Sequence, residues 1–376
     1  MRKVLIVFGT RPEAIKMAPL VRAFQGKPEL FDTRVCVTAQ HREMLDHVLR
    51  FFEIVPDYDL DLMRPGQDLY HITSSVIAGL KPVLEDFKPH LVAVHGDTTT
   101  SSMAALAAFY SGAKVCHIEA GLRTYNKYSP FPEEMNRQLT TRLSDIHFAP
   151  TSEGKNNLLK EGVNEDHIAV TGNTVIDALL LGKEKLKGYE DDEIRFLKEL
   201  ITPGKKLVVV TGHRRENFGE GFLEICKAIK QLALRDDVQF VYPVHLNPNV
   251  QKPVRELLGD LHNVLLIEPL GYPGFLWLMT QSYFILTDSG GIQEEAPSLG
   301  KPVLVMRDTT ERPEALKSGT VKLVGTDPDL IFREASMLLD NEEAYSKMSR
   351  SHNPYGDGTA CVKILQFLSS VQTGID

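Results

Sequence analysis

Short runs of β-branched and aliphatic residues recur along this chain and alternate with longer amphipathic stretches. Such runs are typical of strands buried on both faces of a sheet, and the alternation is typical of βαβ units with parallel strands. One series comprises residues 4–8, 33–38, 91–95, 114–118 and 146–149. A second comprises residues 206–211, 239–243, 264–267, 283–286, 302–305 and 321–324. The sequence therefore predicts an α/β fold with two doubly wound parallel sheets.

The segment between the two series predicts where one domain ends. It contains Thr171-Gly172-Asn173-Thr174, then a helical pattern and the charged stretch 183–199. We place the boundary at Gly172, which gives an N-terminal domain over residues 1–172 and a C-terminal domain that starts at residue 173. Open parallel sheets bind ligands at the carboxyl ends of their strands, so two such domains are expected to face one cleft.

Length and charge exclude several classes of protein. The chain has 376 residues and a formal net charge of -8, which fits about two domains and argues against nucleic acid or an anionic membrane as the main partner. No apolar run approaches the roughly 20 residues that span a bilayer. The apolar run after Met1-Arg2-Lys3 stops at Gly9 without a cleavage pattern. We therefore expect a cytoplasmic protein.

The sequence predicts neither a metal nor a redox cofactor. Its four cysteines are far apart and lack paired metal-ligand spacing, so reduced core thiols are expected. They are Cys36, Cys116, Cys226 and Cys361. The glycine turn after the first strand lacks the Gly-x-Gly-x-x-Gly pattern that would favour a dinucleotide.

Two glycine-containing turns follow predicted strands and lead into helices. The first, Gly9-Thr10-Arg11-Pro12-Glu13, has Lys16 one turn later; the second is Ser289-Gly290-Gly291. Free backbone N–H groups and the helix dipole at such a turn suit a phosphate. Arg11 adds a cation to the first turn, and Glu295 could accept hydrogen bonds from a ribose at the second. Steric reasons alone also explain many such turns, and we take the second as the stronger phosphate site.

Three carboxylates follow neighbouring strands of the first series. Asp97 and Glu119 come after residues 91–95 and 114–118, and Glu133 comes next with Arg137 one turn later. Asp97 could instead be a helix N-cap, and Glu133 a first-turn helix acid. Gathered at one edge of a sheet, the three acids predict a site for proton transfer.

The first strand of the second series leads to Gly212-His213-Arg214-Arg215. A histidine followed by arginines at a strand end suits a polyanion. A single histidine can equally be a structural residue.

Six segments with distinctive sequences are spread over nearly the whole chain. They are FGTRPEAIK (residues 8–16), HGDTTT (95–100), EAGLR (119–123), GHRREN (212–217), DSGGIQEEAP (288–297) and RDTTERP (307–313). Together they resemble segments of the bacterial non-hydrolysing UDP-N-acetylglucosamine 2-epimerases. The resemblance implies a fold of the glycosyltransferase B type, with two Rossmann-like domains facing a cleft, and a homodimer. It also implies that residues 173–355 form the UDP-binding domain and that residues 356–376 form a last helix returning to the first domain.

The resemblance also assigns roles by position. UDP binding falls to Leu270 through its backbone, Phe275, Ser289, Gly290, Gly291, Glu295 and Arg312. The sugar and diphosphate would be surrounded by Arg11, Lys16, Asp97, Glu119, Glu133, Arg137 and His213, of which Asp97, Glu119, Glu133 and His213 are expected to be catalytic.

The expected reaction inverts carbon 2 of UDP-N-acetylglucosamine to give UDP-N-acetylmannosamine, which supplies surface polysaccharide. Because the hydrogen at carbon 2 is not α to a carbonyl, UDP must leave carbon 1 as a base takes that proton, giving 2-acetamidoglucal, and then add back. The carboxylates would work on the two faces of carbon 2, while His213, Arg11 and the Ser289 turn stabilise the departing diphosphate. Clustered acids are expected to raise one another's pKa. Which acid serves which face stays open.

Three other functions compete with this hypothesis. A hydrolysing epimerase would release free N-acetylmannosamine, and the kinase domain often fused to that type is absent from this sequence. A glycosyltransferase of the same fold would require an acceptor. A non-catalytic nucleotide-sugar sensor is opposed by the intact acids. Product analysis without an acceptor separates all four.

Some members of the family bind UDP-N-acetylglucosamine as an activator in a second pocket, and four positions of this sequence match it. They are Gln40, His41, Arg214 and His245. This sequence has Glu43 and Gly66 where strongly activated members carry glutamine and arginine, so we expect weak activation.

Overall fold

The computed structural model describes residues 1–39, 42–62, 64 and 66–370. The chain forms two compact units, Met1–Leu181 with Tyr355–Asp376, and Gly182–Pro354. The division falls inside helix α7 (Thr174–Lys185) and not at Gly172 as the sequence predicted. The reason is that the first turns of α7 bury Ile176 and Leu179 completely and so belong to the first unit.

The first unit contains a seven-stranded parallel sheet with strand order β3-β2-β1-β4-β5-β6-β7. Its strands are β1 (Arg2–Phe8), β2 (Phe31–Val37), β3 (Tyr58–Asp59), β4 (Leu91–His95), β5 (Lys114–Ile118), β6 (Ile146–Ala149) and β7 (Ile168–Val170). All five predicted runs form strands. The two further strands, β3 and β7, are too short to show a periodicity.

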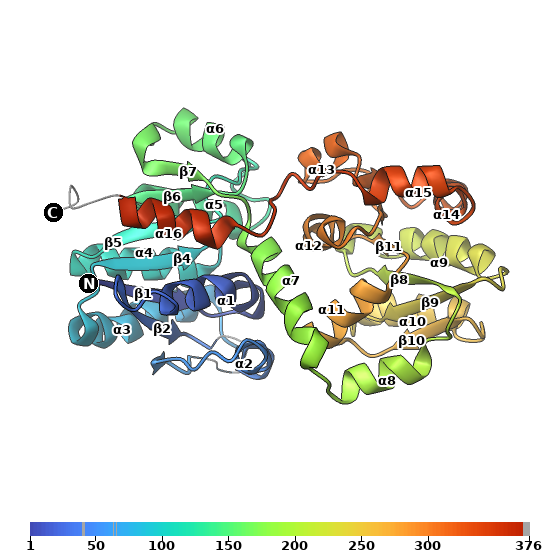
Figure 1. The fold of residues 1–376 in the computed structure, drawn as a ribbon, viewed down its shortest axis with the longest axis horizontal. Coiled ribbons are helices and arrows are strands. Elements are labelled where there is room, and N and C mark those ends of the chain that lie inside the picture. Colours follow the sequence, from blue (N-terminus) through green and yellow to red (C-terminus); the bar gives the residue numbers. More distant parts are fainter. Residues whose placement is uncertain (40–41, 63, 65, 371–376) are drawn as a thin grey trace. The chain divides into compact units, whose positions relative to one another are not determined.

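Helices cover both faces of this sheet (Figure 1). In β1, Leu5 and Val7 pack in one cluster with residues of α3 and α4, and Val4, Ile6 and Phe8 are equally buried. The helices of this unit, besides the start of α7, are α1 (Arg11–Gln25), α2 (Arg42–Phe51), α3 (Leu69–Phe87), α4 (Thr99–Ser111), α5 (Glu133–Leu143), α6 (Ser152–Lys160) and α16 (Ala360–Ser370).

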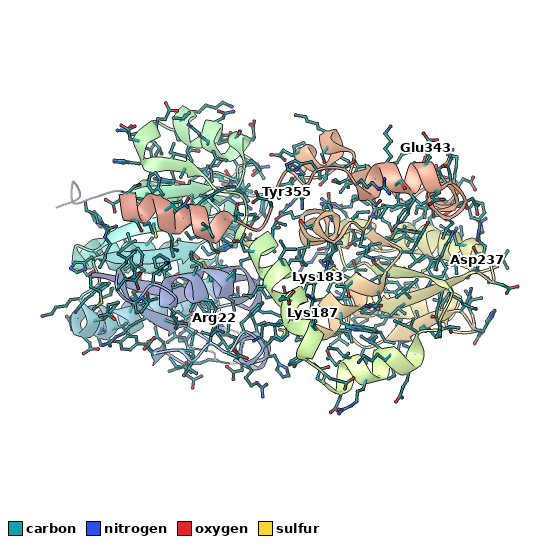
Figure 2. All side chains as sticks on the ribbon, viewed as in Figure 1. Arg22, Lys183, Lys187, Asp237, Glu343 and Tyr355 are labelled. Atoms are coloured by element: carbon teal, nitrogen blue, oxygen red, sulfur yellow. The ribbon has the colours of Figure 1, made fainter. Side chains whose placement is uncertain are left out.

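The C-terminal segment rejoins the first unit. Helix α16 contacts α1, and the carboxylate of Asp177 accepts hydrogen bonds from the backbone N–H groups of Ala360 (3.2 Å) and Cys361 (2.9 Å). The carbonyl of Tyr355, labelled in Figure 2, accepts from the N–H of Asn173 at 2.7 Å. A carboxylate at a helix N-terminus satisfies N–H groups that have no partner within the helix, so Asp177 fixes the start of α16.

The second unit repeats the pattern with six parallel strands in the order β10-β9-β8-β11-β12-β13. They are β8 (Lys206–Thr211), β9 (Val238–Pro243), β10 (Val264–Ile267), β11 (Phe284–Thr287), β12 (Val303–Val305) and β13 (Val321–Leu323). All six predicted runs form strands, with ends that differ by at most one residue. The helices are α8 (Asp192–Leu200), α9 (Glu220–Leu232), α10 (Pro248–Leu258), α11 (Tyr272–Gln281), α12 (Gly290–Glu295), α13 (Pro313–Ser318), α14 (Pro328–Asp340) and α15 (Glu342–Ser349).

Both sheets have the strand order of a doubly wound fold, which confirms the predicted fold class. The order reverses between β1 and β4 in the first sheet and between β8 and β11 in the second. Ligands of open parallel sheets bind at such reversals, beyond the carboxyl ends of the strands. The loops there begin at Gly9, Gly96, Gly212 and Asp288, so four of the conspicuous sequence segments lie at the two expected binding positions.

Within the described ranges, no helix combines the length and the apolar character needed to cross a bilayer.

The four cysteines are buried and free, and burial raises the pKa of Cys36, Cys116 and Cys226 to about 12. Thiols of this kind are core residues and poor nucleophiles.

One close backbone approach shapes the loop after β5. Gly121 has φ +88°, and a Cβ at this residue would lie 2.2 Å from the carbonyl oxygen of Gly154 in α6. Gly121→Ala should therefore combine left-handed backbone strain with a clash and lower the free energy of unfolding by roughly 2–5 kcal/mol. Urea denaturation measures this loss.

Gly112→Ala is the matched control, since Gly112 has φ +77° in the same unit but nothing within 4 Å of an added Cβ. It should lose only the strain, about 1–2 kcal/mol. Equal losses in the two variants would contradict the close packing of α6 against the loop.

Candidate active site

The turn after β1 is tied to the start of α4 by one buried carboxylate. Thr10 caps α1 in a capping box with Glu13, whose Oε2 accepts from the N–H groups of Gly9 (3.1 Å) and Thr10 (2.8 Å). Its Oε1 lies 2.6 Å from Thr98 Oγ1 and 2.9 Å from Ser101 Oγ. Sequence reasoning gave Glu13 no role, although the Thr-x-x-Glu spacing of a capping box was visible.

Glu119 follows β5 with φ +63°, a conformation that residues other than glycine seldom adopt and that often marks a functional site. Its side chain is 8% exposed, and its Oε2 lies 2.5 Å from Lys16 Nζ and 2.7 Å from Asn173 Nδ2. His95 Nε2 lies 3.9 Å from the same oxygen. The structure thus brings the predicted residues Lys16 and Glu119 together, and adds Asn173 and His95, which sequence reasoning missed.

Several neighbours together set the protonation state of Glu119. Burial is the largest influence and by itself would raise the pKa of Glu119, but the ammonium of Lys16, with His95 and the hydrogen bond from Asn173, outweighs it and holds that pKa below its usual range. The expectation that the acids raise one another's pKa is therefore wrong for Glu119, because its nearest charged neighbour is a cation. Burial lowers the pKa of His95 to about 4, which keeps that ring neutral.

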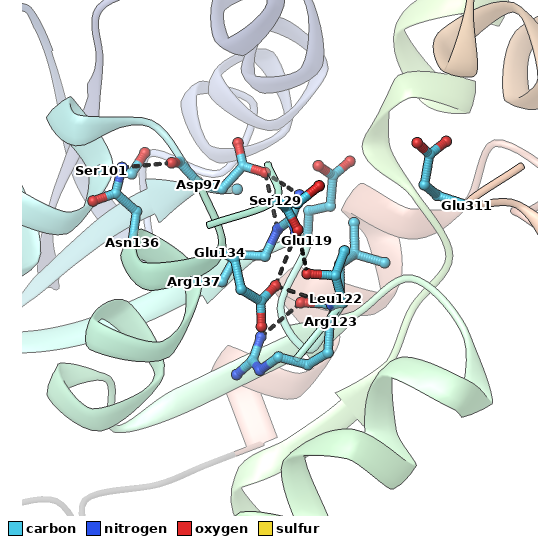
Figure 3. Close-up of polar contacts among 12 residues, drawn as sticks. Asp97, Ser101, Glu119, Leu122, Arg123, Ser129, Glu134, Asn136, Arg137 and Glu311 are labelled. Carbon is cyan, nitrogen blue, oxygen red and sulfur yellow. Dashed lines mark hydrogen bonds and ion pairs between the residues drawn. The ribbon is translucent and has the colours of Figure 1, made fainter. Parts of the chain in front are cut away.

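Asp97 is held by a second cation. Its Oδ2 accepts from Arg137 Nε (3.0 Å) and Nη2 (2.7 Å), and its carbonyl accepts from Asn136 Nδ2 at 2.9 Å. Figure 3 shows Arg137 reaching Asp97 and Glu134 together. The N-cap of α4 is Thr98, so the alternative role considered for Asp97 is wrong. Within the first unit, Arg137 therefore fixes the position of the Asp97 carboxylate.

The two glutamates that begin α5 lie in different surroundings. Glu134 is fully buried and accepts from the N–H groups of Thr124 (3.0 Å) and Tyr125 (3.1 Å), which orders the loop before the helix. Glu133 is half-buried, and its Oε2 has no hydrogen-bond partner among the described residues. No hydrogen bond or ion pair within the described part of the chain joins Glu133 to Asp97 or Glu119.

In the second unit a buried aspartate organises the histidine loop. Asp288, at the end of β11, is completely buried, and its Oδ2 accepts from the backbone N–H groups of His213 and Arg214, both at 2.8 Å. His213 Nδ1 lies 3.4 Å from Asp288 Oδ1. Burial lowers the pKa of His213, although Asp288 opposes this. Sequence reasoning assigned Asp288 no role; its place directly after a buried strand was the available signal.

Two charged side chains lie against the glycine turn that follows Asp288. A Cβ on Gly290 would lie 3.0 Å from the guanidinium of Arg312, and one on Gly291 would lie 3.3 Å from Glu295 Oε1. Ser289 is the N-cap residue of α12. Glycine at these positions therefore lets Arg312 and Glu295 approach the turn. Both lie beside the predicted phosphate site.

Some predicted residues lie apart from this cluster or outside the described part. Phe275 is half-buried in α11. Leu270 comes directly before Gly271, the N-cap residue of this helix, whose N–H donates to the carboxylate of Glu193. Arg11 begins α1 and is half-buried. Gln40 and His41 lie outside the described residues, as does the side chain of Glu43.

The two remaining residues of the predicted second pocket lie beside His213. The rings of His213 and His245 stack with centroids 5.7 Å apart and an interplanar angle of 24°. Arg214 has a buried Nε without a hydrogen-bond partner among the described residues.

Fold and site together define a class of protein. Carboxylates held by cations lie beside one reversal of strand order and are of the kind that can transfer protons, and the glycine turn beside Arg312 at the other is of the kind that can bind an anion. The chain is a doubly wound α/β enzyme of the isomerase class, as comparison with known proteins establishes.

The model of the UDP-N-acetylglucosamine 2-epimerase family matches residues 22–369, and the chain belongs to that family. It is 58% identical over 373 residues to the UDP-N-acetylglucosamine 2-epimerase of Campylobacter jejuni, covering 98% of this chain and 97% of that protein. The Escherichia coli K12 enzyme of the same name is 58% identical over 371 residues, with 98% of each covered. The crystal structure of UDP-GlcNAc 2-epimerase from Neisseria meningitidis bound to UDP-GlcNAc is 56% identical, with a TM-score of 0.87 over 98% of this chain and 99% of that one.

The ion pair of Lys16 and Glu119 predicts how stability depends on pH. In the wild type, Glu119 stabilises the fold above its unfolded pKa of about 4.3, and this stabilisation is lost as pH falls through its lowered folded pKa. In Lys16→Met the lowering by the ammonium is lost, so burial, opposed by the hydrogen bond from Asn173, leaves the folded pKa higher than in the wild type. The variant should be less stable by about 3–5 kcal/mol near neutral pH, and the difference should shrink on acidification.

Urea denaturation at several pH values measures that difference. Adding Glu119→Gln to Lys16→Met should restore stability near neutral pH, because it removes the unpaired charge. Lys155→Met breaks an exposed ion pair with Glu165 and should change little at any pH. A difference between Lys16→Met and wild type that is constant across pH would mean that Glu119 is not held ionised by Lys16.

Proposed function

We propose that this chain interconverts UDP-N-acetylglucosamine and UDP-N-acetylmannosamine by inverting carbon 2, without net release of UDP. The observation that carries the proposal is the buried carboxylate of Glu119 in the loop after β5, which Lys16 of α1 helps to keep ionised. The relatives at 56–58% identity carry the name of this activity, and one was solved with UDP-GlcNAc bound.

The reaction proceeds by elimination and return. A carboxylate takes the proton from carbon 2 while the bond from carbon 1 to UDP breaks, giving 2-acetamidoglucal. UDP then adds back to carbon 1, and carbon 2 receives a proton on the opposite face. Glu119 suits the role of base because its surroundings favour the charged form. Asp97 and Glu133 serve the other face of carbon 2. The buried Oε2 of Glu133 has no hydrogen-bond partner among the described residues.

The second unit holds the leaving group. Gly290 and Gly291 receive the diphosphate with Arg312, Glu295 accepts from the ribose, and Phe275 and the backbone of Leu270 contact the uracil. Arg11 supplies a further cation. The lowered pKa of His213 rises when a diphosphate lies beside it, so His213 becomes a proton donor as UDP departs.

The same resemblance supports the setting of the reaction. The enzyme acts in the cytoplasm as a homodimer, and its product supplies N-acetylmannosamine units for surface polysaccharide. Neither a metal nor a redox cofactor takes part, because elimination and return balance without either.

Isotope exchange tests the proposed chemistry. In deuterium oxide both sugar nucleotides should gain deuterium at carbon 2, since the proton passes through an acid that exchanges with solvent. Proton NMR of UDP-N-acetylglucosamine incubated with the enzyme follows the signal. Formation of the manno product with its original hydrogen retained would contradict the exchange step.

Variants locate the exchanging group. Glu119→Gln should slow exchange and turnover by roughly 10²–10⁴-fold while UDP still binds, because a general base typically contributes that factor. Asp32→Asn is the control, since Asp32 lies near the opposite end of the parallel strands, at the start of β2. Glu119→Gln with wild-type turnover would remove Glu119 from the mechanism.

A second sugar nucleotide acts as a weak activator at Arg214, His245, Gln40 and His41. The stacked pair His213–His245 and the unpartnered Nε of Arg214 support this site. A ligand activates by binding one conformation better than another.

The reverse reaction from pure UDP-N-acetylmannosamine should therefore start slowly and speed up modestly when UDP-N-acetylglucosamine is added. His245→Ala should remove this acceleration. Full reverse activity from the first turnover, together with forward kinetics unaffected by His245→Ala, would show that the second site does not operate.

A further inference from the structure

Glu13 is an acid that the proposed reaction does not use, and it lies at the centre of the first unit's strand reversal. Its side chain is only 2% exposed. Oε2 accepts from Gly9 N–H, Thr10 N–H and the Thr10 hydroxyl at 3.1, 2.8 and 2.8 Å. Oε1 contacts only two hydroxyl oxygens of the described residues, Thr98 Oγ1 and Ser101 Oγ.

The hydrogens around Oε1 can be counted. Ser101 Oγ lies 2.5 Å from the carbonyl oxygen of His95, which has no hydrogen to give, so the single hydroxyl hydrogen of Ser101 lies in that contact. Ser101 Oγ also lies 2.9 Å from Glu13 Oε1. An ionised Glu13 would leave that second contact without a hydrogen. A hydrogen on Oε1 satisfies it.

We propose that Glu13 is a neutral carboxylic acid in the folded enzyme, that its O–H donates to Ser101 Oγ, and that Glu13 thereby positions the turn carrying Arg11 against the loop carrying Asp97. Glu13 is a positioning residue, because its contacts are with Thr10, next to Arg11, and with Thr98, next to Asp97. The inference deepens the proposed function by naming what aligns these two loops.

The charged groups on surrounding elements leave Glu13 without a counter-ion. They are Arg11 and Lys16 on α1, His95 and Asp97 at the end of β4, and Glu119 after β5. Lys16 pairs with Glu119, Asp97 pairs with Arg137, and His95 is neutral. No cation of the described residues is within hydrogen-bond distance of the Glu13 carboxyl, and burial raises its pKa against the lowering effect of its hydrogen bonds.

Glu134 provides the opposite case in the same unit. Like Glu13 it is buried in the first turn of a helix and accepts from two backbone N–H groups. It also accepts from Arg137 Nη1 at 3.1 Å. Although burial acts against this, its hydrogen bonds lower the pKa of Glu134. The pKa values of two buried glutamates of similar local geometry are therefore shifted in opposite directions, because the donors to Glu134, which include the guanidinium of Arg137, outweigh its burial and those to Glu13 do not.

A neutral Glu13 has a consequence for the proposed reaction. An ionised carboxylate beside the turn that carries Arg11 would weaken the attraction of that turn for an anion, whereas a neutral acid joins the turn to the loop after β4 without adding a negative charge. The side chain thus aligns the cationic turn without weakening its attraction for the anion.

Opposite pH dependences of two glutamine variants test the proposal. A raised folded pKa means that the stabilisation by Glu13 is full below its unfolded pKa of about 4.3 and is lost as pH rises through the folded pKa. Glu13→Gln should therefore gain stability relative to wild type as pH rises. Glu134→Gln should lose stability relative to wild type over the same rise, because the ionised form of Glu134 is the stabilising one. Urea denaturation of both variants across pH gives the two slopes.

Infrared spectroscopy of the intact protein reports the proton itself. The C=O stretch of a protonated carboxyl at neutral pH should be lost or weakened in Glu13→Gln, kept in Glu134→Gln, and displaced in Ser101→Ala. If Glu13→Gln fails to fold, the displacement in Ser101→Ala decides. Unchanged bands in both Glu13→Gln and Ser101→Ala, or a Glu13→Gln slope of the same sign as that of Glu134→Gln, would overturn the proposal.

Neither measurement requires turnover, so their outcome is separate from that of the proposed function. If the enzyme turns over, Glu13→Gln should retain more of the wild-type kcat than Glu13→Ala, because the amide keeps a donor for Ser101 and the oxygen that accepts from Gly9 and Thr10, whereas alanine removes both. Equal loss of kcat in the two variants would remove the positioning role.

Discussion

The contact between Lys16 and Glu119 is the constraint on which the first unit depends. A carboxylate that is 8% exposed can stay charged only if a cation and hydrogen-bond donors lie against it. Lys16 comes from α1, Glu119 from the loop after β5, and Asn173 from the segment before α7. Three segments that are distant in sequence must therefore meet at one oxygen. The loop that carries Glu119 has a backbone shaped by the positive φ of Glu119 and by the close approach of Gly121 to α6.

Each unit uses a buried acid to shape the loops at its strand reversal. In the first, Glu13 joins the loops after β1 and β4; in the second, Asp288 joins the loop after β11 to the one after β8. Such acids satisfy backbone N–H groups that would otherwise be buried without partners. The groups proposed for chemistry, Asp97, Glu119 and His213, are then attached to a scaffold whose loops are already fixed.

The strands were predictable from the sequence because each is a short apolar run between polar loops, as in Val208-Val209-Val210. β3 has only two residues and β7 three, too few to show a pattern. The boundary at Gly172 was wrong because a glycine turn resembles a linker, and the sequence does not show that Ile176 is buried in the first unit. Motifs pointed to Asp97, Glu119 and Lys16, and the structure brings Lys16 and Glu119 into contact. The charge state of Glu119 and the roles of Glu13, Asn173 and Asp288 were not predictable, since each arises from a contact between distant segments.

Before substrate binds, Glu119 is an ionised carboxylate in the folded protein. Carbon-13 NMR of the protein labelled at glutamate side-chain carboxyls tests it most directly, with the Glu119 signal assigned by its loss in Glu119→Gln. We expect this signal to keep the chemical shift of an ionised carboxylate throughout the pH range in which the protein is folded. A Glu119 signal that titrates near neutral pH would contradict it.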